Sequence, residues 1–275
     1  METTATEELE VALLLEAIYQ LTSYDFREYN RSSITRRVHN RLALEHLPNI
    51  SRLTEKVIYD EKIRKELLND FSINVTEMFR DPSFFRALRE DILPRFKKLD
   101  DIRIWHAGCA TGEEVFSVAI LLTELGLIDK ATLYATDMNE DVLERAQAAR
   151  FPIQKMQNYT KNYMLAGGSQ AFSEYYYTDS HFAYIKPELL ESISFAQHNL
   201  VTDQSFNEFH LIICRNVLIY FSPPLQNKVY KLFHDSLSRG GFLCLGAKES
   251  LRFSDIMPKF EETITNEKIY QKIYD

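Results

Sequence analysis

Residues 105–114 read Trp-His-Ala-Gly-Cys-Ala-Thr-Gly-Glu-Glu, and no other part of the chain is as informative. A β-rich run, Ile102–Ala107, leads into this stretch and a helical pattern follows it, which predicts a turn between a strand and a helix. Small residues at positions 108, 110 and 112 let the backbone approach a ligand closely, and a helix start supplies N–H groups without intrahelical partners. Taken alone, the stretch is also compatible with an ordinary glycine turn that binds nothing.

Short β-rich runs alternate with helical patterns from residue 102 onward. This alternation is typical of a parallel sheet with helices on both faces. Gly240-Gly241 is expected to end the last helix, and two final runs separated by Asn266-Glu267 predict an antiparallel hairpin at one sheet edge. We expect strands at Ile102–Ala107, Thr132–Thr136, Ser194–His198, Phe209–Cys214, Phe242–Gly246, Phe260–Thr265 and Lys268–Ile273, and helices at Gly112–Leu125, Asn139–Ala149 and Pro223–Ser238.

The remaining segments predict smaller units around this α/β domain, which we expect to span residues 98–275. Helical periodicity over residues 1–73 indicates an N-terminal helical domain. Asp81-Pro82 indicates a helix start within a connecting segment, residues 74–97, with Asp81 as the N-cap. Residues 150–192 interrupt the alternation of strands and helices, and an insertion of this length is usually functional or a small subdomain.

Composition and charge exclude several classes of protein. Apolar residues make up 45% of the 275 residues and charged residues 26%, which is ordinary for a globular protein rather than a disordered or fibrous one. The net charge of −8 argues against a general affinity for nucleic acid. The three cysteines are far apart and form no C-x-x-C pair, so we expect neither a disulfide framework nor a metal site. Without a basic and apolar leader or a run of 18 apolar residues, we expect a cytoplasmic protein that does not insert into a membrane.

Two acidic residues indicate the class of cofactor. Asp137 ends the second predicted strand, about 25 residues beyond the glycine turn, where an acid in doubly wound folds accepts hydrogen bonds from both ribose hydroxyls. Glu113 occupies the position of the third glycine in the dinucleotide pattern G-x-G-x-x-G. A carboxylate there would repel a pyrophosphate but attract the sulfonium and ammonium groups of S-adenosylmethionine, which favours that cofactor over NAD. The alternative for Asp137 is a helix cap, for which Asn139 is better placed.

Two further polar segments follow predicted strands, at the carboxyl ends where open α/β sheets bind ligands. They are Gln197-His198-Asn199-Leu200 and Cys214-Arg215-Asn216-Val217-Leu218-Ile219-Tyr220-Phe221. Polar side chains in such apolar surroundings need hydrogen-bond partners, and a site would supply them. For His198 and Tyr220 taken singly, hydrogen bonding to the backbone is an equally good interpretation.

Three segments together resemble the hallmark blocks of the chemotaxis receptor methyltransferases, the CheR family. They are Asn74-Val75-Thr76-Glu77-Met78-Phe79-Arg80-Asp81, the turn at 107–114, and Cys214–Phe221, in the family's order and spacing. The resemblance covers about residues 25–250. It implies a class I methyltransferase fold, which is Rossmann-like with a mostly parallel seven-stranded sheet, joined to an N-terminal all-α domain and carrying a small inserted β-subdomain. Two departures are Val115, where the family often has proline, and Ala247-Lys248, where it often has His-Ser.

The resemblance also implies a binding site for S-adenosylmethionine, which becomes S-adenosylhomocysteine. The site residues would come from the interdomain segment, the glycine turn and the ends of strands. The expected cofactor contacts are Asn74, Thr76, Arg80, Gly108, Glu113, Asp137, Asn199, Leu200, Arg215 and Asn216. Glu113 and Asp137 would hold the amino-acid and ribose parts of the cofactor, and Asn199 and Leu200 would border its adenine.

The implied activity is S-adenosylmethionine-dependent O-methylation of protein glutamates on a chemotaxis-type receptor, a step in signal transduction. A surface glutamate is already ionised at pH 7, so methyl transfer to its carboxylate needs no strong base. Tyr220 and Arg80 are the candidate catalytic residues, which would orient the acceptor by a hydroxyl and a charge. Two alternatives stay open: a methyltransferase of the same fold with a small-molecule or other acceptor, and a non-catalytic signalling module that binds S-adenosylmethionine.

An arginine-rich segment of the N-terminal domain is the candidate surface for the partner. Residues 27–41 contain five arginines and one acid in an otherwise acidic chain. Ile34, Val38 and Leu42 form the apolar stripe of the predicted helix, which would place Arg37 and Arg41 on one exposed row with Arg36 beside it. The expected partner is the glutamate-bearing helical cytoplasmic region of a membrane chemoreceptor or a related signalling protein. The alternative is that these arginines are solvated or pair with the protein's own acids.

Overall fold

The structure is a computed structural model, and it describes residues 5–72 and 75–274. The chain divides into two compact units. The first comprises Met1–Ile73 together with Ile219–Lys228, and the second comprises Asn74–Leu218 together with Val229–Asp275. The N-terminal unit therefore includes a segment from much later in the sequence, which helical periodicity over residues 1–73 does not predict.

The first unit is built from short helices whose starts are capped by side chains. Asn30 accepts a hydrogen bond from the Ser33 N–H, and Asp60 accepts from two N–H groups in the first turn of its helix. One apolar face of each helix is buried in the core of the unit. The helices are α1 (Ala5–Thr22), α2 (Arg31–Leu44), α3 (Ile50–Tyr59) and α4 (Glu61–Phe71).

The segment Ile219–Lys228 joins this unit through backbone hydrogen bonds. The Asn30 N–H donates to the Tyr220 carbonyl at 2.7 Å, and the Ser222 N–H donates to the Glu28 carbonyl at 3.0 Å. The rings of Tyr29 and Phe221 pack edge to face, with their centroids 4.8 Å apart. Tyr220 is therefore held by the helical unit.

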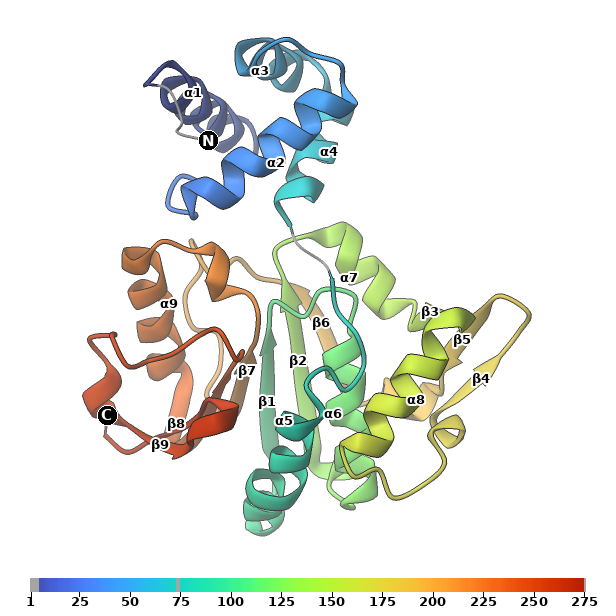
Figure 1. Ribbon diagram of the computed structural model, residues 1–275. Helices are drawn as coiled ribbons and strands as arrows, with labels where there is room; N and C mark the ends of the chain where they lie inside the picture. Colours follow the sequence, from blue (N-terminus) through green and yellow to red (C-terminus); the bar gives the residue numbers. More distant parts are fainter. Residues whose placement is uncertain (1–4, 73–74, 275) are drawn as a thin grey trace. The chain divides into compact units, whose positions relative to one another are not determined.

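A seven-stranded sheet forms the core of the second unit (Figure 1). Its order is β6-β2-β1-β7-β8-β10-β9, with the first five strands parallel and β10 antiparallel to both of its neighbours. This order confirms the predicted class I methyltransferase fold and its hairpin at one edge. The strands are β1 (Ile102–Ala107), β2 (Ala131–Asp137), β6 (Ile193–Gln197), β7 (Phe209–Cys214), β8 (Leu237–Leu245), β9 (Phe260–Ile264) and β10 (Ile269–Lys272).

Helices alternate with these strands, and two predicted details of their ends are wrong. Asp81 precedes α5, but its backbone is left-handed (φ 58°) and its side chain caps no N–H group. Helix α9 ends at Ser236 and β8 begins at the next residue, so Gly240-Gly241 lie inside the strand. The helices are α5 (Pro82–Ala87), α6 (Glu113–Glu124), α7 (Glu140–Gln147), α8 (Met156–Leu165) and α9 (Pro223–Ser236).

The insertion folds as a small antiparallel sheet with one helix. Its strands are β3 (Arg150–Pro152), β4 (Tyr176–Thr178) and β5 (Phe182–Ile185), in the order β3-β5-β4, and α8 lies between β3 and β4 in the sequence. A carboxylate at the end of α6 holds the insertion, because Glu124 accepts hydrogen bonds from the hydroxyls of Tyr163 and Tyr175. Arg89 pairs with the same carboxylate and balances its buried charge.

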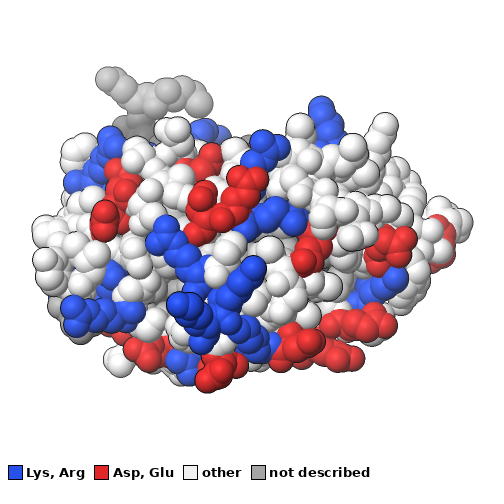
Figure 2. All heavy atoms as spheres, turned by 90° about the horizontal axis from the view of Figure 1, so that it is seen from below, with Lys and Arg blue, Asp and Glu red and all other residues white. Residues whose placement is uncertain are grey.

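The surface carries charges of both signs. Figure 2 shows one face on which Lys and Arg side chains gather near the centre, with Asp and Glu side chains bordering them. Mixed charges of this kind partly cancel and do not create a field of a single sign over that face. Among the described residues, no helix combines the length and apolar character needed to cross a lipid bilayer.

Candidate functional site

The glycine turn lies between β1 and α6, beside the end of β2. The N–H groups of Gly108 and Cys109 both donate to the Thr136 carbonyl, at 2.8 and 2.9 Å. Gly108 has a φ of 80°, and a Cβ added there would lie 2.6 Å from the side chain of Val217. Glycine is therefore required at position 108, both for the backbone conformation and for the close approach of the segment after β7.

Asp137 links this turn to the start of α7. One carboxylate oxygen accepts from the Ala110 N–H and the other from the Asn139 N–H, both at 3.0 Å. Asn139, rather than Asp137, caps α7 with its side chain, as the sequence indicated. Burial raises the pKa of Asp137, because few groups other than these N–H donors compensate the desolvated charge.

Glu113 is the first residue of α6, and only 1% of it is exposed. Its carboxylate accepts hydrogen bonds from the hydroxyls of Thr111 at 2.5 Å and Tyr159 at 3.2 Å. The Lys155 ammonium lies 3.5 Å from the oxygen that Tyr159 contacts. Burial raises the pKa of Glu113, although these donors and the lysine charge act in the opposite direction.

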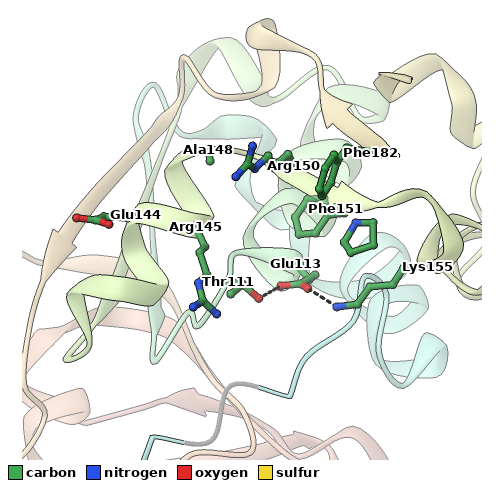
Figure 3. Close-up of a pocket in the computed structure, with 10 residues that line it drawn as sticks. Thr111, Glu113, Glu144, Arg145, Ala148, Arg150, Phe151, Lys155 and Phe182 are labelled. Atoms are coloured by element: carbon green, nitrogen blue, oxygen red, sulfur yellow. Dashed lines mark hydrogen bonds and ion pairs between the residues drawn. The ribbon is translucent and has the colours of Figure 1, made fainter. Parts of the chain in front are cut away.

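Glu113 faces a cleft of about 480 Å³. The cleft is lined by the start of α6, by Arg145 of α7, and by residues of the insertion that include Arg150, Lys155 and Phe182. Figure 3 shows Thr111 and Lys155 on either side of the Glu113 carboxylate, with Arg145 and Arg150 further along the wall. The cleft thus combines one buried anion with several exposed cations.

A second carboxylate of α6, that of Glu114, belongs to an ion-pair network centred on the buried Arg215. Arg215 donates to Glu114 at 3.3 Å and to Asp81 at 2.6 Å, and its guanidinium lies 4.0 Å from the centre of the Phe84 ring. Burial alone would raise the pKa of Glu114, but the hydrogen bond from His106 and the charge of Arg215 hold it below its usual value. Asp81 therefore faces Arg215 instead of capping α5, and Arg215 fixes the segment before α5 to the glycine turn.

Glu249 clamps the segment that follows β7. Its carboxylate accepts from the N–H groups of Asn216 at 3.0 Å, Leu218 at 2.7 Å and Gly246 at 2.6 Å. Asn216 has a φ of 62°, a strained conformation that these hydrogen bonds maintain. Ala247 and Lys248, where the sequence departs from the family's pattern, are both exposed. The departure therefore leaves this clamp intact.

The other predicted cofactor residues lie after β6, in the segment before α5, or outside the described residues. Asn199 follows β6, is buried, and accepts from the Val201 N–H at 3.0 Å, with the buried Leu200 beside it. Arg80 is half-buried, and its guanidinium donates to the Val75 carbonyl at 3.1 Å. Thr76 is also half-buried, and Asn74 lies outside the described residues.

The predicted acceptor and partner residues in the first unit have mixed outcomes. The Arg37 guanidinium lies 5.6 Å from the centre of the Tyr220 ring and donates to the Asp70 carbonyl. The expectation that Arg41 is exposed is wrong, because it is 7% exposed and pairs with Glu66 and Asp70. Its guanidinium reaches the acids of α4, which are too far along the sequence for helix periodicity to reveal. Arg36 is exposed, as expected.

Three contributors were not singled out from the sequence. Lys155 and Tyr159 come from the insertion, where no motif marks them, and only the folding of α8 beside the glycine turn brings them to Glu113. Glu249 directly follows the Ala247-Lys248 departure, but its role depends on contacts with residues more than 30 positions away.

The donor set fits S-adenosylmethionine. Two buried carboxylates with raised pKa values, Glu113 and Asp137, suit a ligand that brings a cation and hydroxyl groups, and they would repel a phosphate. Among the described residues, no cluster of three or more His, Cys, Asp or Glu side chains could hold a metal ion.

Comparisons with known proteins show which family the chain resembles. The family model described as CheR methyltransferase, SAM binding domain, matches residues 74–266, and the CheR methyltransferase, all-alpha domain, matches residues 9–72. The chain is 44% identical to "Putative methyltransferase Cher3" of Pseudomonas putida, over 96% of this chain and 97% of that protein. It is 28% identical to the chemotaxis protein methyltransferase of Listeria innocua, over 82% of this chain and 84% of that protein.

Solved methyltransferase structures show a more distant similarity. The glycopeptide N-methyltransferase MtfA complexed with S-adenosylmethionine matches 64% of this chain and 52% of its own, with 10% identity and a TM-score of 0.36. A similar match, with a TM-score of 0.38, is found for the same enzyme complexed with sinefungin.

The Glu249 clamp yields a direct test. Glu249→Gln should lower the free energy of unfolding by about 3 kcal/mol, because an amide loses the charge and presents an NH₂ group to one of three buried N–H donors. Chemical denaturation measures this loss. The matched control, Ala247→His with Lys248→Ser, should stay within about 0.5 kcal/mol of wild type, because both side chains are exposed. Equal effects of the two variants would contradict the assigned role of Glu249.

Proposed function

The chain belongs to the CheR methyltransferase family and uses S-adenosylmethionine as its cofactor, and from this premise we propose that it methylates glutamate side chains of a protein acceptor. The names of its relatives support the chemotactic setting, since several are chemotaxis protein methyltransferases. The observation that carries the proposal is the pair of buried carboxylates, Glu113 at the start of α6 and Asp137 at the end of β2.

We expect the residues around this pair to contact different parts of the cofactor. Glu113 would hold the amino-acid end of the cofactor and Asp137 its ribose, while Asn199 and Leu200 would border the adenine. When bound, the cofactor supplies an electrophilic methyl group on a positively charged sulfur. Gly108 and Gly112 let neighbouring side chains pack closely against the turn, because an added Cβ would lie 2.6 Å from Val217 at the first position and 2.9 Å from Phe116 at the second. Arg215 and Asn216, held by the ion-pair network and the Glu249 clamp, would close the pocket.

Among the described residues we find no evident base or nucleophile that would activate an amine or a hydroxyl as the methyl acceptor. Burial raises the pKa of the Cys109 and Cys214 thiols, so neither is a thiolate at neutral pH. His106 and His198 are both buried, which keeps their rings away from an incoming acceptor. A carboxylate acceptor needs neither, because it is ionised already and only has to be aligned with the methyl carbon and shielded from water.

Arg80 and Tyr220 are the groups that we propose for orienting the acceptor, with Arg80 also contacting the cofactor. Arg80 belongs to the second unit and Tyr220 to the first. The Arg37 guanidinium over the Tyr220 ring would restrict the orientation of that ring and favour one direction for its hydroxyl. Cytoplasmic localisation and a receptor partner belong to the same proposal.

The bond that the transferred methyl group forms with the acceptor distinguishes this function from its two alternatives. Incubation with methyl-labelled cofactor and membranes from the protein's own source should yield a labelled protein that releases methanol in mild alkali, because carboxyl methyl esters hydrolyse readily. An Asp137→Asn variant, which should bind the cofactor more weakly, serves as the control and should incorporate little label. An alkali-stable label would indicate another acceptor atom, and cofactor binding without any labelling would indicate a non-catalytic module.

Arg36 is the residue of the arginine-rich helix that we propose for contact with the acidic partner. It is exposed on α2, whereas Arg37 and Arg41 are engaged within the unit. A positive group at this position would steer a glutamate-bearing helix more than it would add affinity.

Charge reversal of Arg36 tests this contact. Arg36→Glu should lower receptor methylation about tenfold at low salt, with a smaller effect at high salt, because electrostatic steering is screened. Cofactor affinity and thermal stability should stay at the wild-type level. The matched control is Arg52→Glu, an exposed arginine on α3 of the same unit. Equal methylation by the two variants would return Arg36 to the role of a solvated surface charge.

A further inference from the structure

Lys155 forms an ion pair with Glu113. Glu113 has a proposed role in binding the cofactor, whereas Lys155 has none. The Lys155 side chain is 48% exposed at the cleft, whereas the Glu113 side chain is 1% exposed. Lys155 ends a short turn, Ile153–Lys155, just before α8 in the insertion. Figure 3 shows its ammonium reaching across the cleft wall to the Glu113 carboxylate.

The pair is loose. The Lys155 nitrogen is 3.5 Å from Glu113 Oε1, beyond the usual length of a hydrogen bond between charged groups. Closer donors already serve that carboxylate, since Thr111 and Tyr159 contact its two oxygens. An ammonium has three donors, and among the described residues Lys155 has only the loose contact with Glu113, which leaves donors for a second anion in the cleft.

That second anion is a carboxylate, on an argument that rests on the proposed role of Glu113. If Glu113 holds the ammonium of the cofactor's amino-acid end, the carboxylate on the same carbon must lie close by. Lys155 is the cation that the structure places next to Glu113, so a zwitterion here would complete an alternating set of four charges. A ligand with the ammonium alone would bring a second cation against Lys155 and would be disfavoured.

We propose that Glu113 and Lys155 form a zwitterion site, in which Lys155 binds the carboxylate of the cofactor and makes the enzyme specific for ligands that carry it. Other cations of the cleft are placed differently. The Arg150 guanidinium lies 5.2 Å from the centre of the Phe182 ring, and the Arg80 guanidinium donates to the Val75 carbonyl. Arg145 lines the cleft on α7 without a contact to Glu113 among the described interactions.

Calorimetry with two ligands isolates the role of Lys155. The ligands are S-adenosylhomocysteine and its decarboxylated analogue, which keeps the adenosine and the ammonium. Wild type should prefer the carboxylated ligand, and Lys155→Met should reduce this preference by about tenfold to a hundredfold, the range expected for one charge-assisted hydrogen bond. The reduction should come from weaker binding of S-adenosylhomocysteine, with the affinity for the analogue unchanged or increased.

Matched variants separate specificity from structure. Lys161→Met, at an exposed position on α8, should leave both affinities at the wild-type level. A Lys155→Met protein that loses affinity for both ligands equally would show a structural role and overturn the proposal. The proposal would also be overturned if Lys155→Met kept the wild-type preference for S-adenosylhomocysteine over the analogue. A loss of this preference in Arg80→Met or Arg145→Met instead would have the same meaning.

The methyl-ester assay tests the proposed function independently of the zwitterion site. If Lys155→Met keeps the wild-type preference while the protein still forms an alkali-labile methyl ester, only the zwitterion site is wrong. If Glu113→Gln binds both ligands as wild type does, the role assigned to Glu113 is wrong, and the zwitterion site is wrong with it.

Discussion

The rest of this structure depends on the burial of two carboxylates at one end of a parallel sheet. Asp137 accepts N–H donors from the glycine turn and from the segment before α7, so one side chain sets how β1, β2 and two helices meet. Glu113, at the start of α6, lies at the positive end of a helix, which offsets part of the cost of its burial. The raised pKa values of both groups show that the offset is incomplete. A cationic, hydroxyl-bearing ligand would supply what is missing.

Strain accumulates around this site and is held by ionic contacts. Phe79, Asp81, Ala110 and Asn216 all have positive φ angles, which cost free energy in residues other than glycine. Arg215 holds Asp81, Asp137 holds Ala110, and Glu249 holds Asn216. Three of these four residues are thus fixed by a charged side chain from elsewhere in the sequence, while the Phe79 N–H donates to the Ser117 hydroxyl at 2.9 Å. These contacts preorganise the backbone before a ligand arrives.

Local signals predicted the strands of the sheet and the glycine turn, whereas contacts between residues far apart in the sequence determined the details that the sequence did not predict. β1 and β7 have the expected bounds because their apolar runs end at turn residues. Asp81 has the sequence of an N-cap, yet it pairs with an arginine 134 positions away. Arg41 sits on a basic helix that looks solvated, yet the acids of α4 bury it. The contribution of Lys155 depends on how the insertion packs, and no short motif records that.

The most direct test of the central claim is the pH dependence of S-adenosylhomocysteine binding, measured by calorimetry. If Glu113 binds the ligand ammonium, as we propose, binding requires an ionised Glu113. Burial raises the pKa of that group, so protons would compete with the ligand as the pH falls through the raised value. The association constant should be level at neutral pH and should fall on acidification, beginning above the ordinary pKa range of glutamate. Glu113→Gln should bind S-adenosylhomocysteine more weakly at neutral pH. Its association constant should not show the decrease that the titration of Glu113 causes on acidification. Two results would contradict the account. One is an association constant that stays level as the pH falls to the ordinary pKa range of glutamate, and the other is wild-type binding by Glu113→Gln.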